Sequence, residues 1–183
     1  NAGCDVNRAM SDGRTPAYAA AHNGHTAALE LLVEAGCDVD QAMSDGRTPA
    51  YVAAHNGHTA ALELLVEASC DVNQAQEDGR TPAFAAAHNG HTAVLELLVK
   101  VGCDVNQATS DGWTPAFAAA RFGHTAALDL LVEAGCNVNQ ADKYGQTPAF
   151  AAALEGLTAA LRILVNAACD VNQAATHGMT PAL

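Results

Sequence analysis

The sequence repeats every 33 residues without an insertion or a deletion. The dipeptide Thr-Pro marks each step, at residues 15–16, 48–49, 81–82, 114–115, 147–148 and 180–181. So short a period is incompatible with two ordinary globular domains and indicates a single solenoid, in which each unit buries the apolar face of its neighbour. We therefore divide the chain into partial units at 1–11 and 177–183 and five complete units, called units 1 to 5, at 12–44, 45–77, 78–110, 111–143 and 144–176.

One unit predicts two short helices joined by a turn. Thr15 has the hydroxyl of a good N-cap, and Pro16 suits the first helical position, where a missing N–H costs nothing. The helix should continue through residues 17–22 and end at Asn23-Gly24. We expect Thr26 to cap the second helix. Helices this short are marginal alone, so they depend on packing between units.

Five segments of the unit resemble a known family, and in unit 2 they are Asp45-Gly46-Arg47-Thr48-Pro49, Ala53-Ala54, Gly57-His58, Leu64-Leu65 and Asp71-Val72-Asn73. With their equivalents in the other units, they resemble the ankyrin repeat over essentially the whole chain. The resemblance implies an all-α helix-turn-helix solenoid whose units are joined by turns of β-hairpin type.

Two positions depart from the family pattern in every complete unit. The leucine after Thr-Pro is replaced by alanine, at Ala17, Ala50, Ala83, Ala116 and Ala149. The histidine that follows is replaced by an aromatic residue, at Tyr18, Tyr51, Phe84, Phe117 and Phe150. We expect an aromatic stack in place of the family's histidine hydrogen bonds, with the small alanine leaving room for it.

Composition and charge disfavour several classes of partner. Half of the residues are hydrophobic but only 4% are aromatic, which suits close-packed helices. The chain carries 8 Lys and Arg against 20 Asp and Glu, a formal charge of −12, so we expect no nucleic-acid partner. No apolar run approaches the roughly 20 residues that cross a bilayer, so we expect no membrane insertion. We expect the segment to be monomeric.

The six cysteines follow the same 33-residue step, at Cys4, Cys37, Cys70, Cys103, Cys136 and Cys169. Equivalent residues of stacked helices lie roughly 8–10 Å apart, whereas a disulfide needs Cα atoms within about 4.4–6.8 Å. We therefore expect small buried apolar side chains with free thiols. Free thiols suit a reducing compartment, so we expect an intracellular protein, cytoplasmic or nuclear.

Pairs of histidines recur around the turn between the two helices, as in His22 and His25. A metal site needs imidazoles that converge with further ligands, but the intervening glycine ends a helix and should turn the rings apart. We expect no metal and no cofactor. In the resemblance, His25 and its equivalents are structural, while His22, His55 and His88 should be exposed on the binding side.

Catalytic motifs are absent from the sequence. The recurring Asp-Gly-Arg-Thr-Pro lacks the glycine and lysine spacing of a phosphate-binding loop. Gly-x-Ser-x-Gly and Cys-x-x-Cys are missing as well. Residues that recur in most units are typical of a scaffold, so we expect no enzymatic activity.

Differences between units concentrate in the turn and at the end of the first helix. The resemblance implies that these two regions line a concave groove that holds a protein partner; the alternative is drift at positions that packing does not constrain. The candidate binding residues are Arg14, Arg47, Arg80, Trp113, Arg121, Phe122, Tyr144, Gln146, Leu154, His22, His55 and His88.

Large side chains stand out in units 4 and 5, where Trp113, Phe122 and Leu154 replace polar residues of the earlier units. Trp, Tyr and Arg are enriched in interface hot spots. We expect Trp113 and Tyr144 at the tips of their turns, and one patch formed with Arg121, Phe122 and Leu154. The alternative is an intramolecular contact with a segment outside this sequence.

Two other functions remain open. The segment could regulate or target a larger multidomain enzyme or channel, or it could be a structural spacer in a longer array. The chain starts and stops within a unit and has no polar capping unit, which we interpret as excision from a longer protein.

Overall fold

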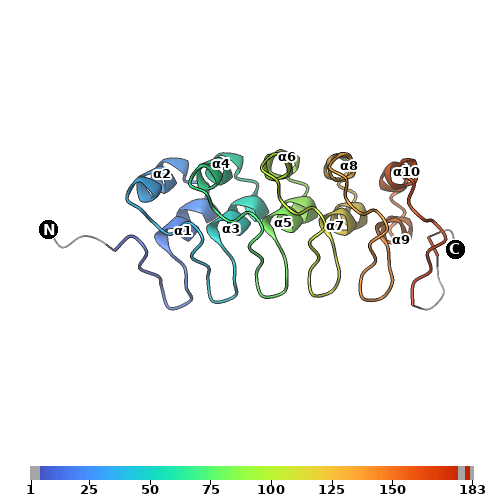
Figure 1. Cartoon of the computed structure of the whole chain (residues 1–183), viewed down its shortest axis with the longest axis horizontal. Coiled ribbons are helices and arrows are strands. Elements are labelled where there is room, and N and C mark those ends of the chain that lie inside the picture. The colour runs from blue at the N-terminus through green and yellow to red at the C-terminus, as the bar shows by residue number, and fades with distance from the viewer. Residues whose placement is uncertain (1–4, 177–179, 182–183) are drawn as a thin grey trace.

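A computed structural model describes residues 5–176 and 180–181. Cys4 and most of the partial unit at 177–183 lie outside the described residues. Within them the chain forms ten α-helices and no strand (Figure 1). The helices are α1 (Pro16–His22), α2 (Thr26–Glu34), α3 (Pro49–Asn56), α4 (Thr59–Glu67), α5 (Pro82–Asn89), α6 (Thr92–Lys100), α7 (Pro115–Phe122), α8 (Thr125–Glu133), α9 (Pro148–Leu154) and α10 (Thr158–Asn166).

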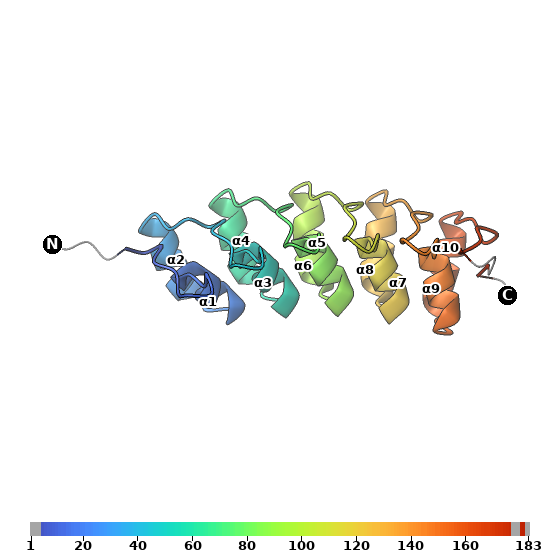
Figure 2. The same ribbon diagram turned by 90° about the horizontal axis from the view of Figure 1, so that it is seen from below.

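The helices form two parallel rows. The first helix of each unit, α1, α3, α5, α7 or α9, belongs to the inner row, and the second helix belongs to the outer row (Figure 1). Long hairpin loops join the units and extend away from the helices on the side of the inner row. The view from below shows the helix pairs stacked side by side along the long axis (Figure 2). The predicted all-α solenoid is thereby confirmed.

Each inner helix begins as the sequence predicts. The hydroxyl of Thr15 accepts the backbone N–H of Tyr18 at 3.1 Å, and Pro16 occupies the first turn. The equivalent threonine makes the same bond in every complete unit, at 3.1–3.2 Å. These buried caps fix the start of each inner helix and hence the point at which the hairpin joins it.

The outer helices begin differently from the prediction. Thr26 is the first residue of α2 rather than its N-cap, and the cap position belongs to His25, whose side chain makes no capping bond. The Thr26 hydroxyl instead lies 3.4 Å from the Gly24 carbonyl. In unit 2 the equivalent histidine, His58, points its Nε2 at the His22 carbonyl of unit 1, 3.1 Å away. The cap histidine therefore ties one unit to the next.

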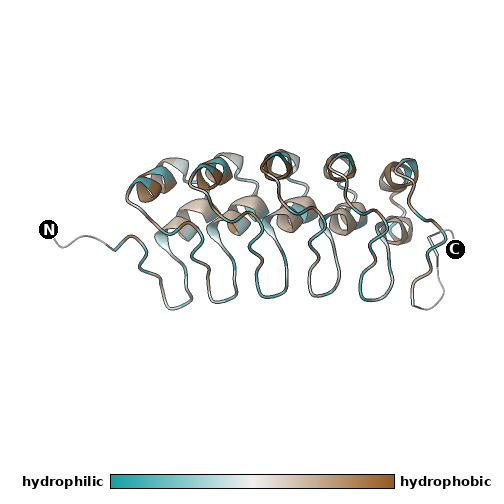
Figure 3. Cartoon of the chain, in the orientation of Figure 1, coloured by the Kyte–Doolittle hydropathy of each residue, from teal (hydrophilic) through white to brown (hydrophobic). Residues whose placement is uncertain are grey.

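The core lies between the two rows. Most alanines of the inner helices are buried, and their small side chains let these helices pack closely. Leucines of the outer helices, such as Leu62 and Leu65, fill the space behind them with no exposed area. The aromatic residue after Thr-Pro-Ala is buried in every complete unit. Hydrophilic residues follow the hairpin loops, and hydrophobic residues concentrate in the helices (Figure 3).

Backbone bonds join the hairpins into a row. Backbone bonds close each described hairpin, as from the N–H of Met43 to the carbonyl of Arg47 at 2.9 Å and from the N–H of Gly46 to the carbonyl of Met43 at 2.9 Å. Neighbouring tips are linked as well, as from the N–H of Ser44 to the carbonyl of Asp12 at 3.2 Å. A second ladder of side-chain acceptors links the units behind the hairpins, starting with Asp38 N–H to Asn7 Oδ1 at 2.7 Å. The hairpin row is therefore held in register.

The five described cysteines are free thiols. Cys70 and Cys103 are buried, and the other three, Cys37, Cys136 and Cys169, are partly buried. Burial raises the pKa of the Cys70 thiol to about 12 and that of Cys103 to about 11. These thiols are protonated at neutral pH, which suits their expected role as small apolar packing groups.

Candidate functional site

The surface between the hairpins and the inner helices presents a repeated set of side chains. We call this surface, lined by residues such as Arg14, Tyr18 and His22, the inner face. At each of the first three tips an aspartate holds an arginine. Asp12 Oδ2 accepts the Nε of Arg14 at 2.7 Å, and its Oδ1 accepts the backbone N–H of the same residue at 3.1 Å. Both bonds lower the pKa of the Asp12 carboxyl, and the bond from the Arg14 backbone N–H contributes most.

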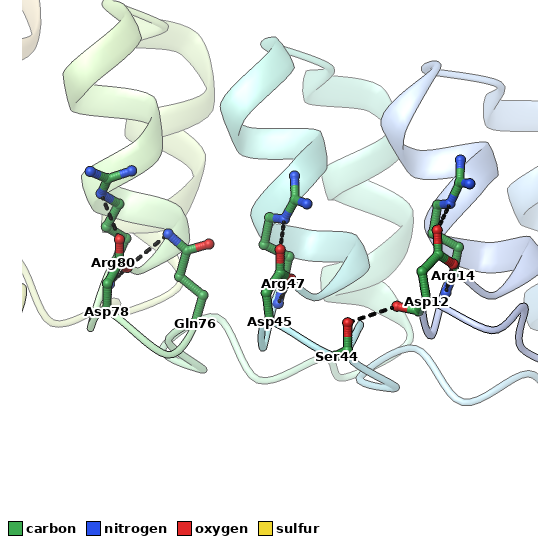
Figure 4. Close-up of polar contacts among 8 residues, drawn as sticks. All are labelled: Asp12, Arg14, Ser44, Asp45, Arg47, Gln76, Asp78 and Arg80. Atoms are coloured by element: carbon green, nitrogen blue, oxygen red, sulfur yellow. Dashed lines mark hydrogen bonds and ion pairs between the residues drawn. The ribbon is translucent and has the colours of Figure 1, made fainter.

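Units 2 and 3 repeat the pair. Nε of Arg47 lies 2.7 Å from Asp45 Oδ2, and Nε of Arg80 lies 3.2 Å from Asp78 Oδ2. Figure 4 shows the three arginines in a row, each beside its own aspartate, with the terminal guanidinium nitrogens pointing away from the carboxylate. All three arginine side chains are substantially exposed. The aspartate therefore orients each arginine and leaves its outer edge open to a ligand.

Two depressions lie between these arginines. The first, of about 330 Å³, has Arg14 and Arg47 on its two sides, with Tyr18 and His22 among its other lining residues. The second, of about 340 Å³, repeats the arrangement one unit further on and is lined by Arg47, Arg80, Tyr51, His55 and His22, among others. The inner face is thus hollowed at the pitch of the repeat.

Aromatic pairs lie along α1, α3 and α5, where the ring after Thr-Pro-Ala meets a histidine of the same helix. The ring of Tyr18 stacks on His22 and that of Tyr51 on His55, with ring centroids 6.1 Å apart in both cases. Phe84 and His88 repeat the contact at 5.9 Å. As expected, His22 and His55 are exposed, whereas His88 is only half-exposed. It also packs edge-on against a ring of the next unit, which covers part of it (see below).

Burial is the largest cause that lowers the pKa of two of these histidines. For His55 the charges of His88, His91, Arg47 and His22 lower it further. For His88 the side-chain hydrogen bond with Asn89 opposes the shift, and the charges of Arg80 and His124 add to it. Both imidazoles are therefore neutral at physiological pH.

Unit 4 replaces the exposed arginine of this set with Trp113, and here the structure corrects the prediction. Trp113 does not lie at the tip of the hairpin; its carbonyl pairs with the Thr109 N–H at 3.0 Å, below the tip. Its half-buried ring turns back onto α7, where it lies 4.9 Å from the Phe117 ring with the Arg121 guanidinium 5.1 Å above it. The attraction of these two partners explains the orientation.

The other large side chains of units 4 and 5 are exposed. Phe122 is 45% exposed at the end of α7, and its ring meets His88 of unit 3 edge-on at 4.5 Å. Tyr144 lies at the next hairpin tip, as predicted, with the Lys143 ammonium 5.1 Å from its ring centroid. Leu154 is 61% exposed at the end of α9. Gln146, the counterpart of Trp113, is half-buried.

The structure brings some residues of the predicted patch into contact. Arg121 contacts Trp113 and reaches Glu155 of unit 5 at 3.6 Å, so it links the two units. Phe122 instead links unit 4 to unit 3. A single patch that also includes Tyr144 and Leu154 stays a prediction.

Sequence reasoning missed the aspartates that hold the arginines. The recurrent Asp-Gly-Arg signalled them, because an aspartate two residues before another residue readily accepts its backbone N–H. It also missed Glu155, whose contact with Arg121 crosses between units at the positions where Asn56 contacts His22 and Asn89 contacts His55.

Neither a metal cluster nor a membrane-spanning helix occurs in the described part of the chain. No three His, Cys, Asp or Glu side chains among these residues lie close enough together to hold a metal ion. No helix in the same residues has the length and apolarity needed to cross a membrane.

Comparison with known proteins gives one match. A family model of ankyrin repeats, in three copies, matches residues 2–76, 69–142 and 84–175. A search of curated proteins found no matching relative.

Proposed function

Because this chain belongs to the ankyrin repeat family, we propose that it binds a protein partner on its inner face. Repeats of this family are generally protein–protein interaction modules and are typically non-catalytic. The proposal adds the face that is used and the residues that contribute most. The observation that supports it best is the exposure of Phe122, Tyr144 and Leu154. Large apolar side chains that are exposed to solvent are typical of contact sites.

Rigid presentation is the proposed mechanism. The hairpins are bonded to one another and capped onto the inner helices, so the side chains of the inner face are in register before a partner arrives. A surface that is already ordered loses little conformational entropy on binding, so more of the contact energy appears as affinity.

The centre of the interface is proposed to lie in units 4 and 5. Trp113 lies between Phe117 and Arg121, which makes it a rigid anchor, and Phe122 and Tyr144 provide exposed aromatic area in the same two units. Aromatic anchors of this kind cost about 2–4 kcal/mol of binding free energy when cut to alanine, or roughly 30- to 1000-fold in affinity. Arg14, Arg47, Arg80 and the exposed histidines would extend the interface along units 1 to 3.

We further propose that the protein is not an enzyme and works inside the cell. The binding role needs only the presented surface and no cofactor. Buried thiols that stay protonated, as at Cys70 and Cys103, persist best in a reducing compartment.

Capture of partners from a cell extract tests the proposal. The native chain is compared with the Trp113→Ala/Phe122→Ala variant and with a matched Glu30→Gln/Glu63→Gln control on the exposed side of α2 and α4. A partner retained by the native chain and the control, but lost from the aromatic variant at equal folded fraction, is the expected result. Equal losses from both variants contradict the proposal, because they indicate a long-range effect of the acidic field.

A further inference from the structure

We propose that the two depressions between Arg14, Arg47 and Arg80 bind acidic side chains of a peptide in the polyproline II conformation, with carboxylates spaced three residues apart. This inference rests on the proposed function above, because it names the chemistry of a segment that the inner face accepts. It assigns the depressions of units 1 to 3 to carboxylate recognition, separately from the aromatic residues of units 4 and 5.

The lining of the depressions is suited to an anionic group. Arg14 and Arg47 flank the first depression, and Arg47 and Arg80 flank the second, so Arg47 serves both. Imidazoles from His22 and His55 add further N–H donors. A carboxylate placed in either depression can therefore meet guanidinium groups from two neighbouring units.

The arginines are positioned for this contact before any ligand binds. Each Nε is taken by an aspartate, at 2.7 Å for Arg14 and Arg47 and 3.2 Å for Arg80. The terminal nitrogens point away from that aspartate (Figure 4). A planar guanidinium edge binds a carboxylate through two parallel hydrogen bonds, and an oriented edge loses less entropy in doing so.

The same aspartates reduce the positive charge of the depressions and hence their attraction for multiply charged anions. Asp12 and Asp45 line the depressions along with the arginines. Each already accepts two bonds from its own arginine, so it adds a negative charge to the site without an available donor. A singly charged carboxylate is repelled less by this charge than a dianionic phosphate is.

The pitch of the repeat sets the spacing in the peptide. Neighbouring inner helices pack at roughly 8–10 Å, and the depressions follow the same pitch. A polyproline II chain has three residues per turn and advances about 3.1 Å per residue, so positions i and i+3 lie on the same face about 9 Å apart. Carboxylates at positions i and i+3 of a peptide in this conformation therefore match two neighbouring depressions.

The overall charge of −12 limits the partner to a short acidic segment. Exposed carboxylates such as Glu30, Glu63 and Glu96 lie on the outer helices. Screening over a Debye length of about 8 Å at physiological ionic strength weakens the effect of such remote charges on a ligand in the depressions. A nucleic acid, with a phosphate at every nucleotide, experiences the whole acidic field and is disfavoured.

Fluorescence anisotropy with short labelled peptides tests the inference. The probe is a proline-rich peptide in the polyproline II conformation with two glutamates three positions apart, compared with its double-glutamine form and with a form whose glutamates are two positions apart. We expect at least about tenfold tighter binding of the first peptide than of either control, as for the loss of charge-assisted bonds.

Protein variants locate the site. Arg47→Gln removes the arginine shared by both depressions and should weaken binding at least about tenfold. Arg47→Lys keeps the charge but not the planar guanidinium, so its affinity should lie between those of the native chain and Arg47→Gln. Arg162→Gln, which removes a positive charge from the exposed side of α10, should change affinity less than about twofold. Circular dichroism establishes that each variant is folded, and Arg14→Gln gives a second test should Arg47→Gln unfold.

Several results overturn the inference. They are equal affinity for the glutamate and glutamine peptides, equal losses in Arg47→Gln and Arg162→Gln, or a single-stranded oligonucleotide that binds more tightly than the glutamate peptide. Absence of peptide binding, with capture of a partner through Trp113 and Phe122 intact, refutes this inference alone. Peptide binding with no effect of Trp113 and Phe122 on capture refutes the aromatic centre of the proposed function instead.

Discussion

Units 1 to 3 and units 4 to 5 share one backbone but present different chemistry on the inner face. In unit 3 the hairpin arginine Arg80 is exposed, and in unit 4 Trp113 occupies the same place and folds back onto α7. The buried threonine caps are alike in both regions, with bonds of 3.1–3.2 Å. The threonine caps thus keep the backbone of the repeat the same in both regions. The exposed side chains can therefore differ in chemistry without changing the backbone.

The junction between units 4 and 5 also differs from the earlier junctions. At the junctions within units 1 to 4, the cap histidines His58, His91 and His124 point Nε2 at a carbonyl of the preceding unit, at 3.0–3.1 Å. At the last junction the equivalent residue is Leu157, a partly buried side chain that packs against the core. The last unit is therefore joined by packing where the earlier ones are joined by a directed bond.

The largest effect is expected from a substitution that disrupts the hydrogen bond of a cap histidine to the preceding unit. A Cβ at Gly90, where φ is 71°, would lie 2.6 Å from Nδ1 of His124 and displace the ring. Gly90→Ala should therefore lower the free energy of unfolding by about 2–3 kcal/mol, from left-handed strain plus the lost hydrogen bond. At Gly123 the new Cβ would meet only the flexible end of Leu157, at 3.1 Å, so Gly123→Ala should cost about 1–2 kcal/mol. Urea denaturation of both variants checks the order, and an equal cost would contradict the role of the histidine.

A smaller effect distinguishes the two kinds of hairpin side chain. Trp113→Ala removes a half-buried ring from Phe117 and Arg121 and should destabilise the fold by about 1–2 kcal/mol. Arg80→Ala, at the matching place in unit 3, removes an exposed ion pair and should cost about 0.5 kcal/mol or less. Urea denaturation measures both. Equal losses would mean that Trp113 contributes no more to packing than an exposed arginine does.

Restoring the bond at the last junction should stabilise the chain. Leu157→His places an imidazole where His124 stands one unit earlier, within reach of the Arg121 carbonyl. We expect a gain of about 0.5–1 kcal/mol, the net contribution of one hydrogen bond less the lost leucine packing. Hydrogen exchange of α9 and α10 amides is the readout, and faster exchange in the variant would refute the equivalence of the junctions.

The smallest effect is a pH dependence confined to units 1 to 3. His55 and His88 have lowered pKa values in the folded protein, so they bind fewer protons there than in the unfolded chain. The free energy of unfolding should therefore fall as the pH drops below about 6.5, the ordinary histidine value. In units 4 and 5 these positions are Arg121 and Leu154, which do not titrate in this range. His55→Gln/His88→Gln should flatten the pH profile of urea midpoints, and an unchanged slope would contradict the assignment.

The sequence was enough to predict the frame of the molecule. The Thr-Pro step placed the start of every complete inner helix, because a hydroxyl cap followed by proline leaves few alternatives for the backbone. It misplaced the start of the outer helices by one residue, since Thr26 has the chemistry of a cap but the structure gives that position to His25. His25 occupies the cap position without a side-chain capping bond. In unit 2 its counterpart, His58, bonds instead to a carbonyl of the preceding unit.

The inner face was less predictable than the frame. The sequence identified Trp113 as unusual, but its inward turn depends on a ring and a guanidinium brought together by the fold, Phe117 and Arg121. The contact of Phe122 with His88 joins residues 34 positions apart in different units. Side-chain directions on a hairpin follow from such neighbours, and a repeat pattern records only the positions.

The most direct test of the central claim is a footprint of a captured partner by hydrogen exchange. The account predicts that, on binding, exchange slows in the hairpin and inner-helix amides, above all around Trp113, Phe122 and Tyr144. It predicts unchanged exchange in α2, α4, α6 and α8, whose exposed side faces away from the hairpins (Figure 1). Slower exchange in those outer helices, with the hairpins unchanged, would contradict the claim that the inner face binds the partner.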